Sequence, residues 1–185
     1  MPADPLRLAA IALTALRATP SPTNVGAWAK AMERTITQAH TAAWLVGTAE
    51  RVKVPVDSPL LSQRRLSRAE RADVRRAVDA QLKYLQGFVA DVRAGRLSEA
   101  QIAARAELYA GATRGTYYAA RWGEWELPWV PGDGSSECLG RCRCSASVVD
   151  SGAGSGVYTW VLGGEQHCTT CPARAGDHPV KRRAA

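Results

Sequence analysis

The chain has 185 residues, of which 46% are hydrophobic and 22% are charged, so its composition excludes an intrinsically disordered protein and allows one domain with an appendage. Its net charge of +7, from 24 Lys and Arg against 17 Asp and Glu, suits anionic neighbours such as nucleic acid and equally an ordinary basic surface. No segment reaches the ~20 apolar residues that a membrane-spanning helix needs, so we expect no membrane contact.

Helical periodicity runs through the first 126 residues. Residues 5–18, which include the sequence LAAIALTAL, favour a short amphipathic helix over a cleaved signal peptide. A second helix is predicted to begin near Thr23 or Asn24, either of which can cap it, and to end before Val54-Pro55. Its apolar side chains recur every three or four residues and therefore share one face: Val25, Trp28, Met32, Ile36, Ala39, Ala43 and Val46.

Two further helices are marked by capping boxes. The third begins at the box formed by Ser67 and Glu70, ends at Gly95, and has the apolar stripe Val74, Val78, Leu82, Leu85, Val89 and Val92. The fourth begins at a box formed by Ser98 and Gln101 and continues to Gly123, with a common face of Ile102, Ala106, Tyr109, Thr113 and Tyr117. The short link between them predicts antiparallel neighbours, and so a helical bundle or a long helical hairpin.

Arginines crowd the start of the third helix, at positions 64, 65, 68, 71, 75 and 76. Glu70, Asp73 and Asp79 are interleaved with them, which favours a solvated face with internal ion pairs. The alternative is a patch that contacts DNA phosphate or an acidic partner.

The remainder of the chain is rich in Gly and Pro. Residues 127–136, LPWVPGDGSS, are predicted to be a linker because Pro and Gly break helices. Residues 144–149 and 157–164 have the pattern of two strands joined by the flexible turn SGAGSG, which predicts a β-hairpin. The chain is therefore divided into a helical domain at 1–126, the linker, a small Cys-rich domain at 137–180 and a frayed basic tail at 181–185. The predicted fold class is mainly α, within α+β.

All five cysteines lie in this small domain, together with one histidine that could join them. A hairpin brings its two ends together, so the segments before the first strand and after the second should converge. Thiolates and imidazoles at such spacing are the ligands of structural zinc in ribbons and knuckles. The candidate ligands of one zinc ion are Cys138, Cys142, Cys144, His167, Cys168 and Cys171. The best set of four takes Cys138, either Cys142 or Cys144, and both Cys168 and Cys171, and His167 could replace one of them.

Other chemistries fit the cysteines less well. An odd number of cysteines leaves one over in a closed disulfide framework, and the cytosol disfavours disulfides. A thioredoxin-like use of Cys168 and Cys171 requires a βαβ context, which is not predicted. Glu137 and Glu165 flank the ligands and are interpreted as surface acids, so no catalytic set is expected and the protein is not predicted to be an enzyme.

Three segments of the second half resemble a known family. They are GRLSEAQIAARAELYAGATRGTYYAARW, LPWVPGDGSSECLGRCRCSASV and WVLGGEQHCTTCPARAG. Together they resemble the phage head morphogenesis or minor head proteins of tailed phages, a group related to the Mu F and SPP1 minor head proteins. The resemblance covers about residues 95–178. The order of the Cys motifs differs from the Mu-type arrangement, in which Cys-x2-Cys precedes His-Pro-x-Cys-Arg-Cys.

This resemblance implies a structural protein of the virion, assembled in the host cytoplasm and located in the head interior or at the portal vertex. It implies portal, major capsid or scaffold proteins as partners, packaged DNA as a further neighbour, and a role in head assembly, DNA packaging or ejection. No small-molecule substrate is expected.

Two alternatives remain. One is a zinc-ribbon protein that binds nucleic acid through basic residues near the metal, namely Arg141, Arg143, Arg174, Lys181, Arg182 and Arg183. In that case Trp122, Trp125 and Trp129 could stack on bases, although tryptophans beside a helix end are more often a packing cluster. The second alternative is a thiol oxidoreductase.

Overall fold

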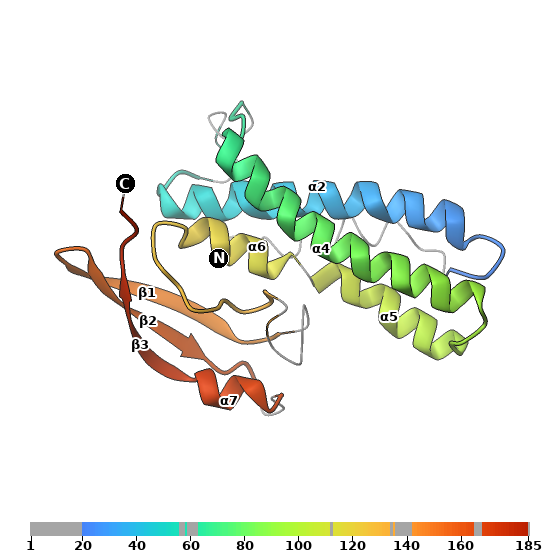
Figure 1. Cartoon of the computed structure of the whole chain (residues 1–185). Coiled ribbons are helices and arrows are strands. Elements are labelled where there is room, and N and C mark those ends of the chain that lie inside the picture. Colours follow the sequence, from blue (N-terminus) through green and yellow to red (C-terminus); the bar gives the residue numbers. More distant parts are fainter. Residues whose placement is uncertain are drawn as a thin grey trace.

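The computed structural model combines long helices with a small antiparallel sheet that lies against one end of them (Figure 1). It describes residues 20–55, 58, 63–111, 113–133, 135, 142–164 and 168–184. The helices in these ranges are α2 (Val25–Arg51), α4 (Arg68–Arg93), α5 (Glu99–Gly111), α6 (Arg114–Arg121) and α7 (Thr170–Arg174). The strands are β1 (Ser145–Gly152), β2 (Ser155–Val161) and β3 (Gly176–Lys181). The predicted class, mainly α within α+β, is confirmed, and the helix predicted at residues 5–18 lies outside the described ranges.

Helix α2 contributes to both hydrophobic cores along its length. Every residue of its predicted apolar stripe is buried. Val25, Met32 and Ile36 pack in a first core with residues of α4, whereas Ala43 and Val46 pack in a second core with α6 and the sheet. Because one continuous helix contributes to both cores, it holds the sheet in position relative to the rest of the bundle.

Helix α4 follows its prediction closely. Its capping box is formed, since Ser67 Oγ accepts from the Glu70 N–H and the Ser67 N–H donates to the Glu70 carboxylate. Leu82 is half-buried, and the rest of the predicted stripe is buried. The sequence reading missed Phe88, which is fully buried and packs edge-on against Trp28 with 5.6 Å between the ring centroids.

The prediction of one continuous fourth helix is wrong. Its capping box at Ser98 and Gln101 is present, but α5 ends at Gly111 and α6 begins at Arg114. The interruption follows a glycine, which has the lowest helix propensity of any residue except proline. The break separates α5, which contributes Ile102 to the first core, from α6, which contributes Ala120 to the first core and Tyr117 and Tyr118 to the second.

Glycine at position 47 allows α2 and α6 to approach closely, and this gives a test of the packing. A Cβ at Gly47 would lie 2.3 Å from the carbonyl oxygen of Tyr117, whereas one at Gly87 on α4 would meet no atom within 4 Å. We expect Gly47→Ala to lower the free energy of unfolding by about 2–3 kcal/mol through overpacking. Gly87→Ala is the matched control and should raise it by about 0.5–1 kcal/mol through helix propensity. Urea denaturation measures both, and equal effects of the two changes would contradict the packing.

The sheet has the order β1-β2-β3, with both pairs antiparallel. The predicted hairpin is confirmed, and Ser145 pairs with Val161 at the end where the strands enter and leave. The third strand was not predicted because its sequence, GDHPVK, contains proline. Pro179 is tolerated because β3 is an edge strand, where a missing N–H need not break the sheet.

The expectation of a frayed basic tail is wrong. The Arg183 N–H donates to the Glu124 carbonyl, the Lys181 carbonyl accepts from the Glu126 N–H, and Arg182 forms a bridge with Trp125. These bonds attach the end of the chain to the segment that follows α6. The division at 127–136 stays a prediction, but Val130 and Trp129 of that segment pack in the second core rather than lying apart from it.

Candidate metal centre

The two ligand-bearing segments meet where the hairpin opens. Cys142 and Cys144 immediately precede β1, while Cys168 and Cys171 follow β2, with Cys171 on α7. The two segments touch at Gly163, where a Cβ would lie only 1.9 Å from the carbonyl oxygen of Arg143. No side chain fits at that crossing, so glycine there allows the cysteines of the two segments to converge.

Three thiols form a compact buried group. The Sγ atoms of Cys142, Cys144 and Cys171 all lie within 4.8 Å of one another. The side chains of the three residues are almost inaccessible, with exposed fractions of 2%, 3% and 1%. Sulfur ligands in a tetrahedral zinc site lie ~3.8 Å apart, because each Zn–S bond is ~2.3 Å. The distance of 4.0 Å between Cys142 Sγ and Cys171 Sγ matches that spacing, so these residues lie close enough to bind a metal ion.

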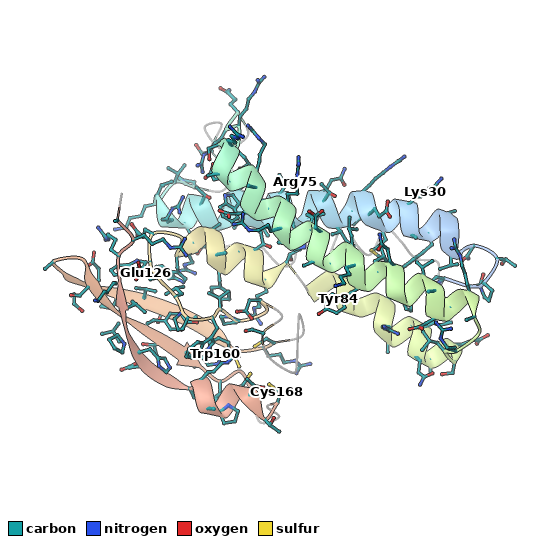
Figure 2. The ribbon with its side chains drawn as sticks, viewed as in Figure 1. Lys30, Arg75, Tyr84, Glu126, Trp160 and Cys168 are labelled. Carbon is teal, nitrogen blue, oxygen red and sulfur yellow. The ribbon has the colours of Figure 1, made fainter. Side chains whose placement is uncertain are left out.

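Cys168 lies at the edge of this group and is half-buried. Its Sγ is 3.1 Å from Cys171 Sγ, well beyond the ~2.0 Å of a disulfide bond. It falls outside the mutual 4.8 Å limit that the other three satisfy. In Figure 2 its side chain lies at the lower end of the sheet, near Trp160. The position makes Cys168 the fourth candidate thiol among the residues that the structure describes.

The surroundings of Cys144 favour its thiolate form. Burial raises the pKa of the Cys144 thiol, but the Gly163 N–H and the thiols of Cys142 and Cys171 outweigh this effect and hold that pKa below its ordinary value. A backbone N–H that donates to sulfur stabilises negative charge on a ligand and also fixes its orientation.

The sequence prediction of the ligands can be compared residue by residue. The structure brings Cys142 and Cys144 together in the same cluster, whereas the sequence reading had to choose one of them. Cys171 is in the cluster and Cys168 is adjacent to it. Cys138 and His167, together with Glu137 and Glu165, lie outside the described ranges.

Aromatic and arginine side chains support the segments around the cluster. The Arg174 guanidinium lies over the rings of Trp129 and Trp160, at 5.2 and 5.7 Å from their centroids, and donates to Ser135. Arg114 of α6 donates to the carbonyl oxygen of Cys142. The cluster is thereby connected to α6 and to the segment that was predicted to be a linker.

A buried histidine occupies the junction of three helices. His40 on α2 is 2% exposed, and its ring nitrogens lie 2.6 Å from Thr116 Oγ1 of α6 and 2.6 Å from Gln81 Oε1 of α4. The amide oxygen can only accept, so Nε2 carries the proton and Nδ1 accepts from the Thr116 hydroxyl. No motif around His40 in the sequence indicates these contacts.

Burial lowers the pKa of His40 from its ordinary value of 6.5, and the hydrogen bond with Gln81 opposes this only in part. The unfolded chain therefore binds the proton more readily, and stability should fall as pH is lowered below about 6.5, by at most ~1.4 kcal/mol per pH unit for this group. His40→Gln should remove the contribution of this group to the dependence of stability on pH. Urea midpoints at about pH 7.5 and about pH 5.5 test it, and an unchanged slope in the variant would contradict the assignment.

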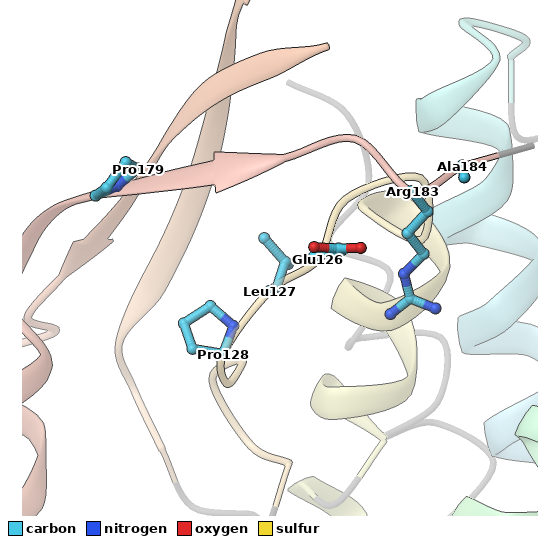
Figure 3. Close-up of a pocket in the computed structure, with 6 residues that line it drawn as sticks. All are labelled: Glu126, Leu127, Pro128, Pro179, Arg183 and Ala184. Carbon is cyan, nitrogen blue, oxygen red and sulfur yellow. The ribbon is translucent and has the colours of Figure 1, made fainter.

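A shallow surface depression lies on the opposite side of β3 from β2. It is lined by Glu126, Leu127, Pro128, Pro179, Arg183 and Ala184 (Figure 3). Backbone hydrogen bonds join the two segments that line it, and Arg183 Nε donates to the carbonyl oxygen of Trp125. The lining presents no grouped acid, base or nucleophile that would indicate a reaction.

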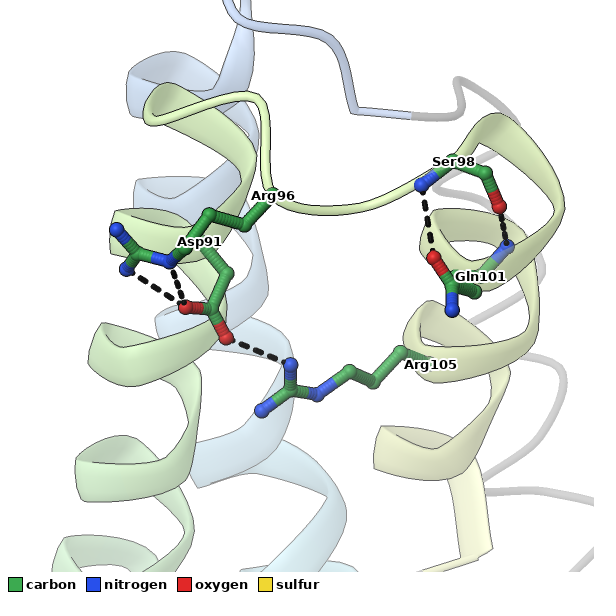
Figure 4. A network of polar contacts seen from close by, with 5 residues as sticks. All are labelled: Asp91, Arg96, Ser98, Gln101 and Arg105. Atoms are coloured by element: carbon green, nitrogen blue, oxygen red, sulfur yellow. Dashed lines mark hydrogen bonds and ion pairs between the residues drawn. The ribbon is translucent and has the colours of Figure 1, made fainter.

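A polar network fixes the turn between α4 and α5. Hydrogen bonds from Arg96 and Arg105 to Asp91 hold the pKa of its carboxyl below its usual value (Figure 4). Figure 4 also shows the capping box of Ser98 and Gln101 at the start of α5. The network serves the antiparallel packing of these helices.

No helix among the described residues is long and apolar enough to span a membrane.

The comparisons with known proteins identified no similar protein. No protein-family model, curated protein sequence or solved structure matches the chain.

Proposed function

We propose that this protein is a structural protein of a tailed-phage head, a minor head protein, in which a structural zinc ion fastens the C-terminal sheet to the helices. The observation that carries the zinc site is the buried group of three cysteine thiols at the open end of the hairpin. Cys168 is proposed as the fourth ligand because its sulfur lies beside that of Cys171.

Burial argues that the metal is structural rather than catalytic. A catalytic zinc keeps one coordination position open to water or substrate. Here Cys142, Cys144 and Cys171 are each at most 3% exposed, and they belong to the second core together with the buried Trp160. A metal held in this way would add folding free energy to a sheet of three short strands, which buries little core by itself.

The alternative, a zinc-ribbon protein that binds nucleic acid, is weakened because several of the basic residues that it requires already contact other parts of the protein. Arg174 lies over two tryptophan rings, Arg182 pairs with Asp150 and lies over Trp125, and Arg183 donates to a backbone carbonyl. Trp125 is buried, and Trp122 and Trp129 are partly buried against the second core, as in a packing cluster. These side chains support the fold around the metal, and Arg141 lies outside the described ranges.

The virion role is supported by the resemblance of residues 95–178 to minor head proteins, and a buried group of thiols that could hold a structural metal is compatible with it. Its test is mass spectrometry of purified virions and procapsids from the phage or prophage that encodes the chain. We expect peptides of this protein in at least one of the two particles, at low copy number relative to the major capsid protein. Its absence from both would overturn the proposal.

A further inference from the structure

The amino-terminal end of α4 carries several arginines that form no ion pair with any acid among the described residues. Of the arginines there, Arg64 is paired with Glu70 at 2.6 Å, and Arg76 is paired with Asp73. Arg71 donates to the carbonyl oxygen of Leu66. Two of the three interleaved acids, Glu70 and Asp73, are therefore occupied by particular arginines, a distinction that the sequence could not make. The third, Asp79, lies four residues after Arg75 and has no ion pair among the described residues.

Three arginines remain, and we call them the arginine face: Arg65, Arg68 and Arg75. All three are exposed, and none has an ion pair within the part of the chain that the structure describes. Arg68 and Arg75 are seven residues apart, so they lie two turns apart on one side of α4, ~10 Å along its axis. Arg65 lies two residues before the N-cap at the same end.

The arginine face lies at the amino-terminal end of a helix, and this position increases its positive electrostatic potential. The amino terminus of a helix carries a partial positive charge, so acids stabilise it and arginines there cost stability. Local rules that are broken without a structural compensation are most often found at functional sites. The end of α4 also projects past α2 in Figure 1, and Arg75 lies on the outer side of α4 in Figure 2, so an extended ligand can reach it.

The surroundings of the arginine face distinguish between two classes of partner. A protein interface needs buried apolar anchors at its centre. The exposed large apolar side chains of the described residues are Val52, Tyr84, Val149 and Val161, and none lies between positions 63 and 79. Small residues, Ala69 and Ala72, lie between the arginines and leave room for a close approach. Such a surface suits phosphates better than an acidic protein.

We propose that the arginine face binds the phosphate backbone of double-stranded DNA without sequence preference. This inference is independent of the virion role and of the zinc site, since it rests on α4 alone. Each phosphate contact releases counterions, so the slope of log affinity against log salt should reach about −3 for three contacts.

The test uses the full-length, metal-loaded chain and a labelled mixed-sequence DNA duplex, with fluorescence anisotropy between about 50 and about 200 mM salt. The variant Arg65→Gln/Arg68→Gln/Arg75→Gln should reduce the slope by about 2–3 units. Lys30→Gln/Arg34→Gln/Lys83→Gln is the matched control, because it removes the same charge from exposed helical positions and should change the slope by less than about 1 unit.

Equal effects of the two triple variants would overturn the proposal, because binding would then depend on net charge alone. Absence of duplex binding at about 50 mM salt would also overturn it, and binding of poly-glutamate under those conditions would identify an acidic protein as the partner instead. All six substituted side chains are exposed, so unchanged thermal midpoints should show that each variant is folded.

Discussion

Replacing Cys171 with serine should abolish metal binding and unfold the C-terminal sheet while the helices of the first core remain folded. Cys171 Sγ lies 4.0 Å from Cys142 Sγ and 3.1 Å from Cys168 Sγ, and it belongs to the buried group, so its loss leaves the site incomplete. The free energy of unfolding of the sheet should fall by at least about 3 kcal/mol, because binding at structural zinc sites reaches ~10 kcal/mol. The measurement is metal content together with tryptophan fluorescence during urea denaturation.

Two controls separate the metal from the packing of the thiol. Ala173→Ser places the same hydroxyl at an exposed position of α7 and should leave both metal content and stability unchanged within about 0.5 kcal/mol. Chelator treatment should lower the stability of the parent protein to that of Cys171→Ser. If the difference between parent and variant survives chelation in full, the cysteine stabilises the sheet through packing rather than through a metal.

Gly163→Ala should separate the two ligand-bearing segments without changing any ligand. The added Cβ would lie 1.9 Å from the Arg143 carbonyl oxygen and 2.9 Å from the Cys144 backbone nitrogen, and backbone atoms cannot move aside as a flexible side chain does. The Cys144 sulfur would also lose the hydrogen bond that the Gly163 N–H donates to it. We expect loss of metal binding and a fall in stability of about 3 kcal/mol or more, at the upper end of overpacking effects.

The adjacent Gly164→Ala is the matched comparison for this change. A Cβ at Gly164 would meet no atom within 4 Å, but the residue has φ of +95°. Its substitution should cost about 1–2 kcal/mol through backbone strain and should leave the metal bound. Retention of full metal content by Gly163→Ala would show that the close crossing is not required for the site.

The helices could be predicted because single apolar stripes and capping residues determine them locally. The seven-residue stripe of α2 and the box of Ser67 and Glu70 are both present as expected. The break between α5 and α6 could not be predicted, since the spacing of Ile102, Ala106, Tyr109, Thr113 and Tyr117 continues across it without interruption. Phe88 was missed because it directly precedes Val89 of the stripe and so lies beside the three- and four-residue spacing on which that prediction rested.

The sheet shows where local pattern fails. Strands β1 and β2 carry alternating apolar residues, whereas β3 contains Pro179 and is held by pairing with β2 and by contacts with the segment after α6. The docking of the basic tail has the same cause, since Arg182 and Arg183 contact residues more than fifty positions earlier. Contacts between residues so far apart in the sequence produce no periodic pattern of apolar residues.

The candidate site was predictable in outline but not in its ligand set. The sequence showed that cysteines flank a hairpin, and antiparallel pairing of Ser145 with Val161 brings those flanks together. Spacing alone could not show that Cys142 and Cys144, separated by one residue, both face the same buried point. Nor could it show that Arg174 and the tryptophans form the support around it.

The central claim is that buried thiols hold one zinc ion as a structural site. The direct test is elemental analysis of protein purified without chelator, followed by X-ray absorption at the metal edge. We predict about one zinc per chain, with a first shell dominated by sulfur at ~2.3 Å. A chain that contains no metal, and whose cysteines all react at once with a thiol reagent in the folded state, would contradict it.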